Sequence, residues 1–224
     1  MAGSVAVQLD PGRGTYLVRV RLDRARVVVV RRRIGRGRWA RSRIYRLAAG
    51  EYLYVGSALG PGGLAARVGR HLSSGAGKAP HWDIDFLLSR AIRPARLEAW
   101  GLPACGDGLE CRWARAIAAA KGSRPVVGRL EGSERADRGF GAGDCRSRCG
   151  CPEGGPASLR THLFRAGFRP DLPGMRRLLG APLVALRLGA SRPRRPRLAG
   201  GGPGPRAPPR PGARSRPGPR PRAR

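Results

Sequence analysis

The pattern of apolar and polar residues along the chain predicts three strands before any helix. Residues 15–22 alternate, with apolar side chains on one face and Arg19 and Arg21 on the other, as in a strand with one buried face. Residues 27–30 are four consecutive valines, which is typical of a short central strand. Residues 51–57 (EYLYVGS) predict the third strand.

Helical periodicity begins after Pro61, a residue that suits a first helical turn. Leu64, Val68 and Leu72 form an apolar stripe at every fourth residue. The later expected elements are a helix over 81–90, a strand over 96–102 and a helix through Leu109, Trp113 and Ile117. The order β-β-β-α-α-β-α predicts an α+β domain, in which helices flank a central, mostly antiparallel sheet of three to four strands.

Composition divides the chain into a domain and a tail. Residues 1–189 suit one domain without internal repeats. Within them, residues 123–160 are a loop rich in Gly, Cys and Arg, closed by the apolar segment SLRTHLF. Residues 190–224 hold 11 arginines, no acid and Leu198 as the only large apolar residue, so we expect a disordered Arg-, Pro- and Gly-rich tail.

The charge balance points to a polyanionic partner. The chain has 45 Lys and Arg residues against 14 Asp and Glu residues, a net charge of +31. Because the tail holds 11 of the arginines and no acid, residues 1–189 keep a net charge of +20. This excess argues against an ordinary neutral metabolic enzyme. It favours nucleic acid over an acidic membrane, because the sequence contains no evident amphipathic basic helix.

We expect a cytoplasmic protein that does not enter a membrane. No stretch approaches the roughly 18 apolar residues of a membrane-spanning helix. The first residues, MAGSVAVQLD, lack the basic and apolar regions of a secretory signal. The five cysteines, an odd number, fit a reducing compartment.

Two tripeptides, GTY at 14–16 and YVG at 54–56, followed by a helix that carries Arg67, resemble the GIY-YIG nuclease superfamily. The spacing between them is longer than in its compact members. Five blocks follow in order within residues 14–165: YVGSALGPGGLAARVGRHL, HWDIDFLL, LECRWAR, GFGAGDC and HLF. On these blocks the chain resembles the little-characterised archaeal and bacterial GIY-YIG-like proteins that are sometimes fused to endonuclease III-type glycosylases.

The resemblance implies a phosphodiester hydrolase that depends on Mg²⁺ or Mn²⁺. In such an enzyme a tyrosine handles the attacking water, an arginine contacts the phosphate and a glutamate holds one cation. The corresponding residues here are Tyr16, with Tyr54 as a second candidate tyrosine, Arg67 and Glu110. A phenol with a pKa near 10 is a poor base at neutral pH, so Tyr16 needs help from a nearby cation or metal-bound water. If His71 takes part in the reaction, it positions water or protonates the leaving oxygen. The alternative is a structural role, in which its side chain is only hydrogen-bonded to the backbone.

Simpler explanations stand beside these roles. A strand tyrosine is often only a packing residue. Glu110 and Asp107 have the spacing of a capping box, in which the glutamate merely begins a helix. At 100° per residue, Arg67 and His71 fall on one flank of the apolar stripe, whereas Arg70 falls on the opposite side and is expected in solvent.

The nucleic-acid contacts are expected to come from Gly56, Arg19, Arg21 and His81. Gly56 and the glycines of residues 60–63 precede a helix N-terminus, where free amides favour a phosphate, although glycines also serve simply as turns. His81 is four residues before Asp85, a spacing that suits metal binding or acid–base coupling.

A zinc site is a weaker hypothesis. Cys145, Cys149, Cys151 and His162 offer four ligands, but their spacing is not that of the common paired-cysteine modules. Free thiols are the alternative.

Three classes of function remain. The leading one is a metal-dependent endonuclease that cleaves DNA or structured nucleic acid, in repair or recombination. The alternative is a non-catalytic nucleic-acid-binding module, in which Arg19, Arg21, Arg31 to Arg33 and the tail bind phosphates. A third is a structural protein associated with RNA, which the charge favours but the ordered motifs do not.

Overall fold

A computed structural model describes residues 7–8, 12–31, 33–34, 38–39, 41–73, 79–89, 92, 94–103, 108–133, 136–141 and 161–187. The predictions for the tail and for Cys145, Cys149 and Cys151 lie outside these residues. No helix within the described ranges is long and apolar enough to cross a membrane.

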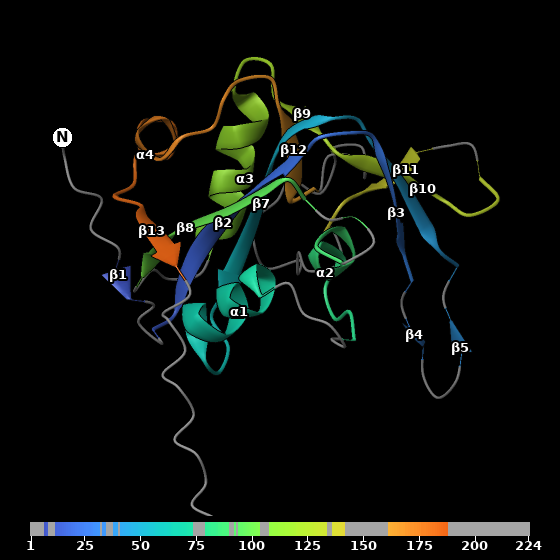
Figure 1. Ribbon diagram of the computed structural model, residues 1–224, viewed down its shortest axis with the longest axis horizontal. Coiled ribbons are helices and arrows are strands. Elements are labelled where there is room, and N and C mark those ends of the chain that lie inside the picture. The colour runs from blue at the N-terminus through green and yellow to red at the C-terminus, as the bar shows by residue number, and fades with distance from the viewer. Residues whose placement is uncertain are drawn as a thin grey trace, which may run out of the picture. The chain divides into compact units, whose positions relative to one another are not determined.

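Among the described residues, the larger sheet has seven strands (Figure 1). In spatial order they are β1 (Val7–Gln8), β13 (Val184–Arg187), β8 (Arg96–Pro103), β2 (Gly14–Leu22), β7 (Gly50–Ala58), β12 (Leu163–Ala166) and β9 (Arg124–Pro125). Of the pairs that these described strands make, β1 with β13 is parallel and the others are antiparallel. The two segments that carry the tripeptides, β2 and β7, are therefore neighbours at the centre of this sheet.

A second sheet has four strands in the order β11 (Ala136–Gly139), β10 (Val127–Leu130), β6 (Arg43–Leu47) and β3 (Arg26–Val30). Between β3 and β6 the chain forms a separate two-stranded ribbon, β4 (Arg33–Ile34) and β5 (Arg38–Trp39). The long spacing between the two tripeptides is thus occupied by strands of a second sheet and a ribbon.

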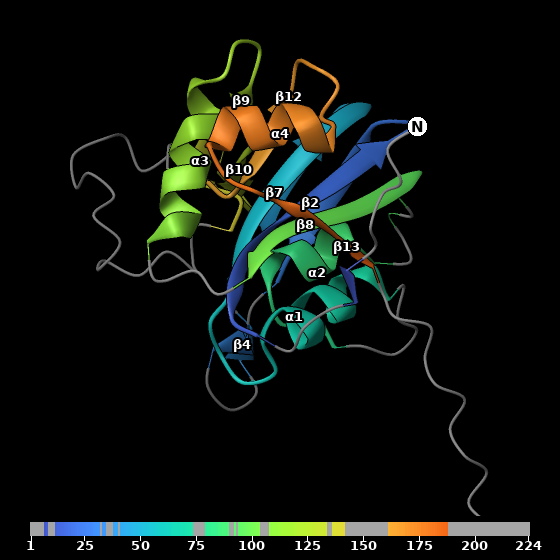
Figure 2. The ribbon, with the colours of Figure 1, turned by 90° about the vertical axis from the view of Figure 1, so that its left-hand side faces the viewer.

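Helices cover both faces of the larger sheet (Figure 2). They are α1 (Gly63–Leu72), α2 (Asp83–Leu87), α3 (Leu109–Ala119) and α4 (Leu172–Leu179). Successive residues of a strand point to opposite faces of the sheet. Tyr16 and Val18 of β2 therefore belong to the core that contains Leu64 and Val68 of α1. Leu17 belongs to the core on the other face, which contains residues of α3 and α4. The structure has two apolar cores, one on each side of the sheet.

The α+β class and the mostly antiparallel arrangement are confirmed, but two details of the prediction are wrong. The larger sheet has seven strands rather than three to four, and strands β1 to β7 all precede the first helix. The strands β1, β4, β5, β6 and β13 and the helix α4 were not predicted, and β9, β10 and β11 lie in the segment that was predicted to be a loop.

Candidate active site

The structure brings three of the predicted catalytic side chains together from three elements. Tyr16 of β2, Tyr54 of β7 and His71 of α1 lie on the same side of the sheet. The ring centroids of the two tyrosines are 6.5 Å apart, and those of Tyr16 and His71 are 5.7 Å apart. We call these three residues the Tyr–His cluster. Their relative exposure is only 1%, 3% and 2%, so the cluster is closed over within the described part of the chain.

Gly56 makes room for the phenol of Tyr16. It lies directly opposite Tyr16 in the β2–β7 register. A Cβ atom at Gly56 would overlap the hydroxyl and ring of Tyr16. This buried position is inconsistent with the predicted contact between Gly56 and nucleic acid, because the glycine faces a protein ring rather than solvent.

Tyr16 is hydrogen-bonded to His71, which in turn faces Asp85 of α2. The phenolic oxygen of Tyr16 lies 2.9 Å from Nε2 of His71. On the other side of the imidazole, Nδ1 lies 3.4 Å from Oδ1 of Asp85, a contact longer than an ordinary hydrogen bond. A carboxylate at this position favours the proton on Nδ1, which leaves Nε2 to accept from the tyrosine.

The electrostatics of this arrangement keep His71 neutral and Asp85 charged. Burial lowers the pKa of His71, and this outweighs the opposing influence of Asp85. Burial alone would raise the pKa of Asp85, but the contact with His71 and hydrogen bonds from the amides of His81 and Trp82 and from Arg70 hold it well below its usual range. A neutral imidazole beside a phenol is able to accept a proton.

The lowered pKa of His71 predicts that stability decreases in mild acid. The unfolded chain takes up a proton near pH 6.5, whereas the folded chain resists it, so stability is highest above this pH and falls below it. The urea midpoint of the wild type should therefore decrease between pH 7.5 and 5 more steeply than that of His71→Gln, which lacks this group. Parallel pH profiles would contradict the assignment of a buried neutral histidine.

Arg67 is held beside the cluster by an aromatic ring. Its guanidinium carbon lies 3.7 Å from the ring centroid of Trp82, and the Trp82 ring is 6.0 Å from that of His71. Stacking fixes the plane of the guanidinium, a geometry that suits bidentate contact with a phosphate. Arg67 is half-buried and is thus more accessible than the three residues of the Tyr–His cluster.

Arg70 does not lie free in solvent, so the helix-face prediction for it is wrong. Its Nε and Nη2 atoms lie 3.2 and 3.0 Å from Oδ2 of Asp85. The reason is tertiary, because the segment leading into α2 packs against this flank of α1. Arg70 therefore belongs to the same network as His71.

His81 does not form the predicted side-chain couple with Asp85. Its backbone amide donates to Oδ2 of Asp85 at 2.8 Å, because residues 81–82 precede α2 and wrap over its first turn. The imidazole of His81 is exposed and lies against the ring of Trp82. The histidine whose side chain faces Asp85 is His71.

The N-terminus of α1 is not a free anion site. The amide of Gly63 donates to the carbonyl of Gly60, and the amide of Leu64 donates to that of Gly12. Gly62 and Gly63 both have positive φ angles, of 79° and 51°. The structure thus supports the turn explanation for these glycines.

Glu110 pairs with His162. Its Oε1 atom lies 2.9 Å from Nδ1 of His162, which directly precedes β12. The N-cap of α3 is Gly108, without a side-chain cap, so Glu110 does not occupy the third position that a capping box requires. Asp107 lies outside the described residues. A Cβ at Gly141 would contact both Tyr54 and His162, which places the Glu110 pair next to the Tyr–His cluster.

The donors around Glu110 fit a weakly held divalent cation. Glu110 is partly exposed, with 18% of its side chain accessible, and the imidazole of His162 lies beside it. The described residues contain no group of three or more His, Cys, Asp or Glu side chains placed to hold a metal. Mg²⁺ commonly takes only one or two protein carboxylates and completes its shell with water and substrate phosphates, so Glu110 alone satisfies this minimum. The predicted zinc ligand His162 is engaged with Glu110, and its three cysteine partners lie outside the described residues.

Arg19 is not available to bind nucleic acid. It is 4% exposed and its guanidinium contacts Glu51 at 2.8 Å and Glu98 at 3.0 Å. Hydrogen bonding to Glu51 raises the pKa of Arg19, in keeping with a satisfied ion pair. Arg21, two residues further along β2, is exposed and remains a candidate contact.

Arg19 and Arg21 should therefore respond differently to the same substitution. Arg19→Gln leaves the partly buried Glu51 without its cation and Glu98 with Arg96 alone, and we expect a loss of about 1–3 kcal/mol of stability. Arg21→Gln should leave the free energy of unfolding nearly unchanged. Urea unfolding of both variants measures the difference, and equal stabilities would contradict the structural role of Arg19.

Two sets of contacts in the site were not predicted from the sequence. Trp82 holds Arg67, and Asp85 contacts His71 and Arg70 rather than the side chain of His81.

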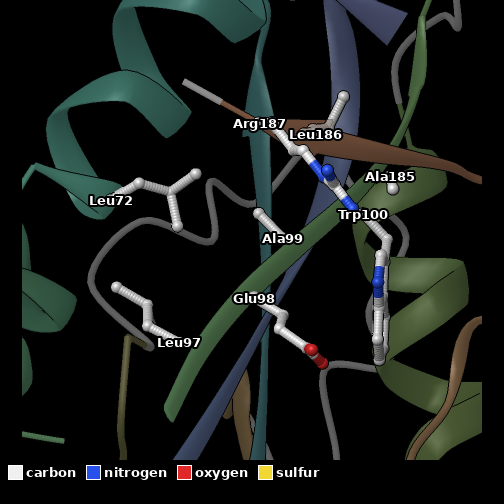
Figure 3. A pocket seen from close by; sticks show the side chains of 8 residues that line it. All are labelled: Leu72, Leu97, Glu98, Ala99, Trp100, Ala185, Leu186 and Arg187. Atoms are coloured by element: carbon white, nitrogen blue, oxygen red, sulfur yellow. The ribbon is translucent and has the colours of Figure 1, made fainter. Parts of the chain in front are cut away.

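A pocket of about 350 Å³ lies away from this site, between α1, β8 and β13 (Figure 3). Its lining, which includes Leu72, Trp100 and Arg187, contains none of the predicted site residues.

Comparison with known proteins gave one match. A family model with the description "Domain of unknown function DUF123" matches residues 15–152, which is more than half of the chain. The comparisons with curated proteins and with solved structures found no match.

Proposed function

From the residues of this chain, which belongs to the DUF123 family of domains of unknown function, we propose an enzymatic activity. The protein is a divalent-metal-dependent endonuclease of the GIY-YIG type. The observation that supports this most strongly is the hydrogen bond between Tyr16 and His71, with Arg67 beside it and Asp85 behind it. The substrate is a nucleic acid, in keeping with the net charge of +31.

In the proposed reaction, a water molecule attacks phosphorus and the bond to the leaving oxygen breaks. Tyr16 takes the proton of the water as its own phenolic proton passes to Nε2 of His71. Asp85 stabilises the imidazolium that forms. Arg67 binds the non-bridging oxygens of the phosphate. Because the phenol is 1% exposed, side chains around it have to move when the substrate binds.

The cation belongs at Glu110, with His162 beside it. When bound, a divalent cation neutralises charge on the phosphate and on the leaving oxygen. We propose Mg²⁺ or Mn²⁺, because a carboxylate and water are ligands that both ions accept.

The alternative is a non-catalytic module that binds nucleic acid on the same fold. The burial of all three residues of the Tyr–His cluster favours it, because a closed cluster offers no surface for a phosphate. In this alternative the hydrogen bond of Tyr16 to His71 only stabilises the core.

One experiment separates the two functions. Labelled plain, branched and damaged DNA duplexes are incubated with purified protein in Mg²⁺, Mn²⁺ or EDTA, and binding is measured in parallel by gel shift in EDTA. The endonuclease predicts cleavage in either metal and none in EDTA. Binding without cleavage of any substrate would support the module, and absence of both would exclude both functions.

A further inference from the structure

An exposed aromatic side chain lies next to the ring that holds Arg67. The imidazole of His81 packs against the indole of Trp82, with ring centroids 4.5 Å apart and an angle of 86° between the two planes. The guanidinium carbon of Arg67 lies 3.7 Å from the centroid of the same indole. Within the described part of the chain His81 is exposed, in contrast to the buried Tyr–His cluster. An accessible ring therefore stands beside the residue that contacts the phosphate in the proposed function.

The segment that carries His81 is held in place although it lies at the surface. It passes between α1 and α2, two helices on the same side of the larger sheet (Figure 2). Nη2 of Arg70 donates to the carbonyl of Ala79 at 2.6 Å. The amides of His81 and Trp82 donate to Oδ2 of Asp85 at 2.8 and 3.1 Å. These hydrogen bonds fix the backbone, so little further ordering of the segment is needed when a ligand contacts the ring.

The two carboxylates nearest to this ring are engaged with donors of the protein. Asp85 contacts Arg70 and His71 in addition to the two amides, and only 11% of its side chain is accessible. Asp83 is 5% exposed and accepts from the amide of Gly141 at 3.0 Å. Neither carboxylate is therefore free to repel a phosphate that approaches the exposed side of the segment.

An aromatic ring beside a phosphate-binding arginine suits a nucleobase. Every base has a π face, and aromatic side chains that stack on bases are a common means of binding unpaired nucleotides. Because Arg67 and His81 contact the same indole, a phosphate on the arginine and a base on the imidazole belong to one nucleotide or to adjacent ones. A base inside a duplex has both faces covered by its neighbours, so only an unpaired or extruded base reaches the imidazole.

We infer that His81, supported by Trp82, stacks on an unpaired nucleobase next to the phosphate that Arg67 contacts. The site then prefers a nucleic acid with an unpaired nucleotide beside the cleaved bond over an uninterrupted duplex. His81 is thus a residue that determines specificity, and it takes no part in the proton transfers of the Tyr–His cluster. This inference rests on the nucleic-acid substrate of the proposed function.

The test compares labelled DNA duplexes that differ in one base. Two of them contain a one-nucleotide bulge, which carries adenine in the first and an abasic sugar in the second, so that their phosphates are the same. The third duplex has no bulge. Fluorescence anisotropy measures the affinity of the full chain for each of them in EDTA, which prevents cleavage.

Three substitutions separate stacking from charge. His81→Ala removes the ring, His81→Phe keeps an aromatic ring without its nitrogens, and His81→Lys puts a charge in place of the ring. Urea unfolding verifies that each variant is folded. If the removal of the side chain in His81→Ala destabilises the protein, His81→Lys serves as the variant without a ring.

We expect the wild type to bind the adenine bulge about 5- to 150-fold more tightly than the abasic bulge, the range typical of one stacked base. His81→Phe should keep most of this preference, because its ring also offers a face to the base. His81→Ala should bind both bulges as the wild type binds the abasic one. His81→Lys can raise the affinity for all three duplexes through their phosphates, but it should not restore the preference for adenine.

Equal affinity of the wild type for the two bulges would overturn the inference. A preference that survives in His81→Ala would also overturn it, because the base would then be bound elsewhere. A preference that His81→Lys keeps and His81→Phe loses would show recognition by charge instead of by a ring. In these three cases the proposed nuclease stands, since cleavage in Mg²⁺ is measured separately. If the wild type binds none of the duplexes, the inference and the proposed function both fail.

Discussion

Replacing Tyr16 with phenylalanine should reduce the rate of metal-dependent DNA cleavage by about 100- to 1,000-fold, while affinity measured in EDTA stays within about twofold. The substitution removes only the hydroxyl that lies 2.9 Å from His71. Loss of one group that interacts with the transition state typically costs about 2.7–4 kcal/mol. Single-turnover cleavage of a labelled duplex measures the rate, and a gel shift measures the affinity.

Tyr52→Phe is the matched control. Tyr52 is equally buried, and its hydroxyl donates to the carbonyl of Ala48 at 2.7 Å, away from the Tyr–His cluster. Both substitutions remove a buried, hydrogen-bonded hydroxyl, so both should lose a similar amount of stability. Only Tyr16→Phe should lose cleavage. If Tyr52→Phe reduced the cleavage rate as much as Tyr16→Phe does, the loss in Tyr16→Phe would reflect lower stability rather than a catalytic role.

Replacing Glu110 with glutamine should abolish cleavage in Mg²⁺ and leave DNA binding in EDTA unchanged. The amide keeps the shape of the side chain but removes the charge that a divalent cation requires. Cleavage is followed as a function of metal concentration, because a weakened ligand raises the concentration needed for half-maximal rate.

His162→Gln shows whether Glu110 is a ligand or only a partner of His162. If Glu110 holds the cation, His162→Gln should retain cleavage and raise the metal requirement by about 10- to 100-fold, as expected for a residue that orients a ligand. If both variants lose stability equally and Glu110→Gln still cleaves, the 2.9 Å pair is structural and the cation site lies elsewhere.

The central strands and first helix of the fold were predictable because their burial follows the local pattern. Residues 15–22 alternate and form β2, and the stripe of Leu64, Val68 and Leu72 lies on α1. The strand β6 (RIYRL) was missed although Tyr45 and Leu47 alternate with arginines, because five residues with two arginines give a weak signal. β10 was not predicted because it contains Gly128, and a glycine in a sequence suggests a loop. The structure requires this glycine because the ring of Tyr45 packs directly over it.

The helix α4 was missed although its start signals were present. Asp171 caps it by accepting from the amide of Gly174, and Pro173 occupies its first turn. Pro and Gly stand together in its segment, a combination that is typical of a turn or loop. Propensity was overridden here by packing, since Met175 is buried against the second apolar core.

The candidate site was predictable in its residue types but not in its partners. The tyrosines and His71 could be named, but the approach of Asp85 to His71 joins residues from two elements, and no spacing along the chain encodes it. The prediction that Arg19 lies on the polar face of its strand and contacts nucleic acid was also wrong, because its partners come from other strands. Its position opposite Glu98 depends on the register between β2 and β8, which only the assembled sheet defines.

The most direct test of the account is nicking of a supercoiled plasmid by wild-type and Tyr16→Phe proteins purified side by side, each in Mg²⁺ and in EDTA. The account predicts that the wild type nicks the plasmid only in Mg²⁺ and that Tyr16→Phe at the same concentration leaves it supercoiled. No nicking by the wild type in Mg²⁺, or equal nicking by both proteins, would contradict the claim that this chain hydrolyses phosphodiester bonds through Tyr16.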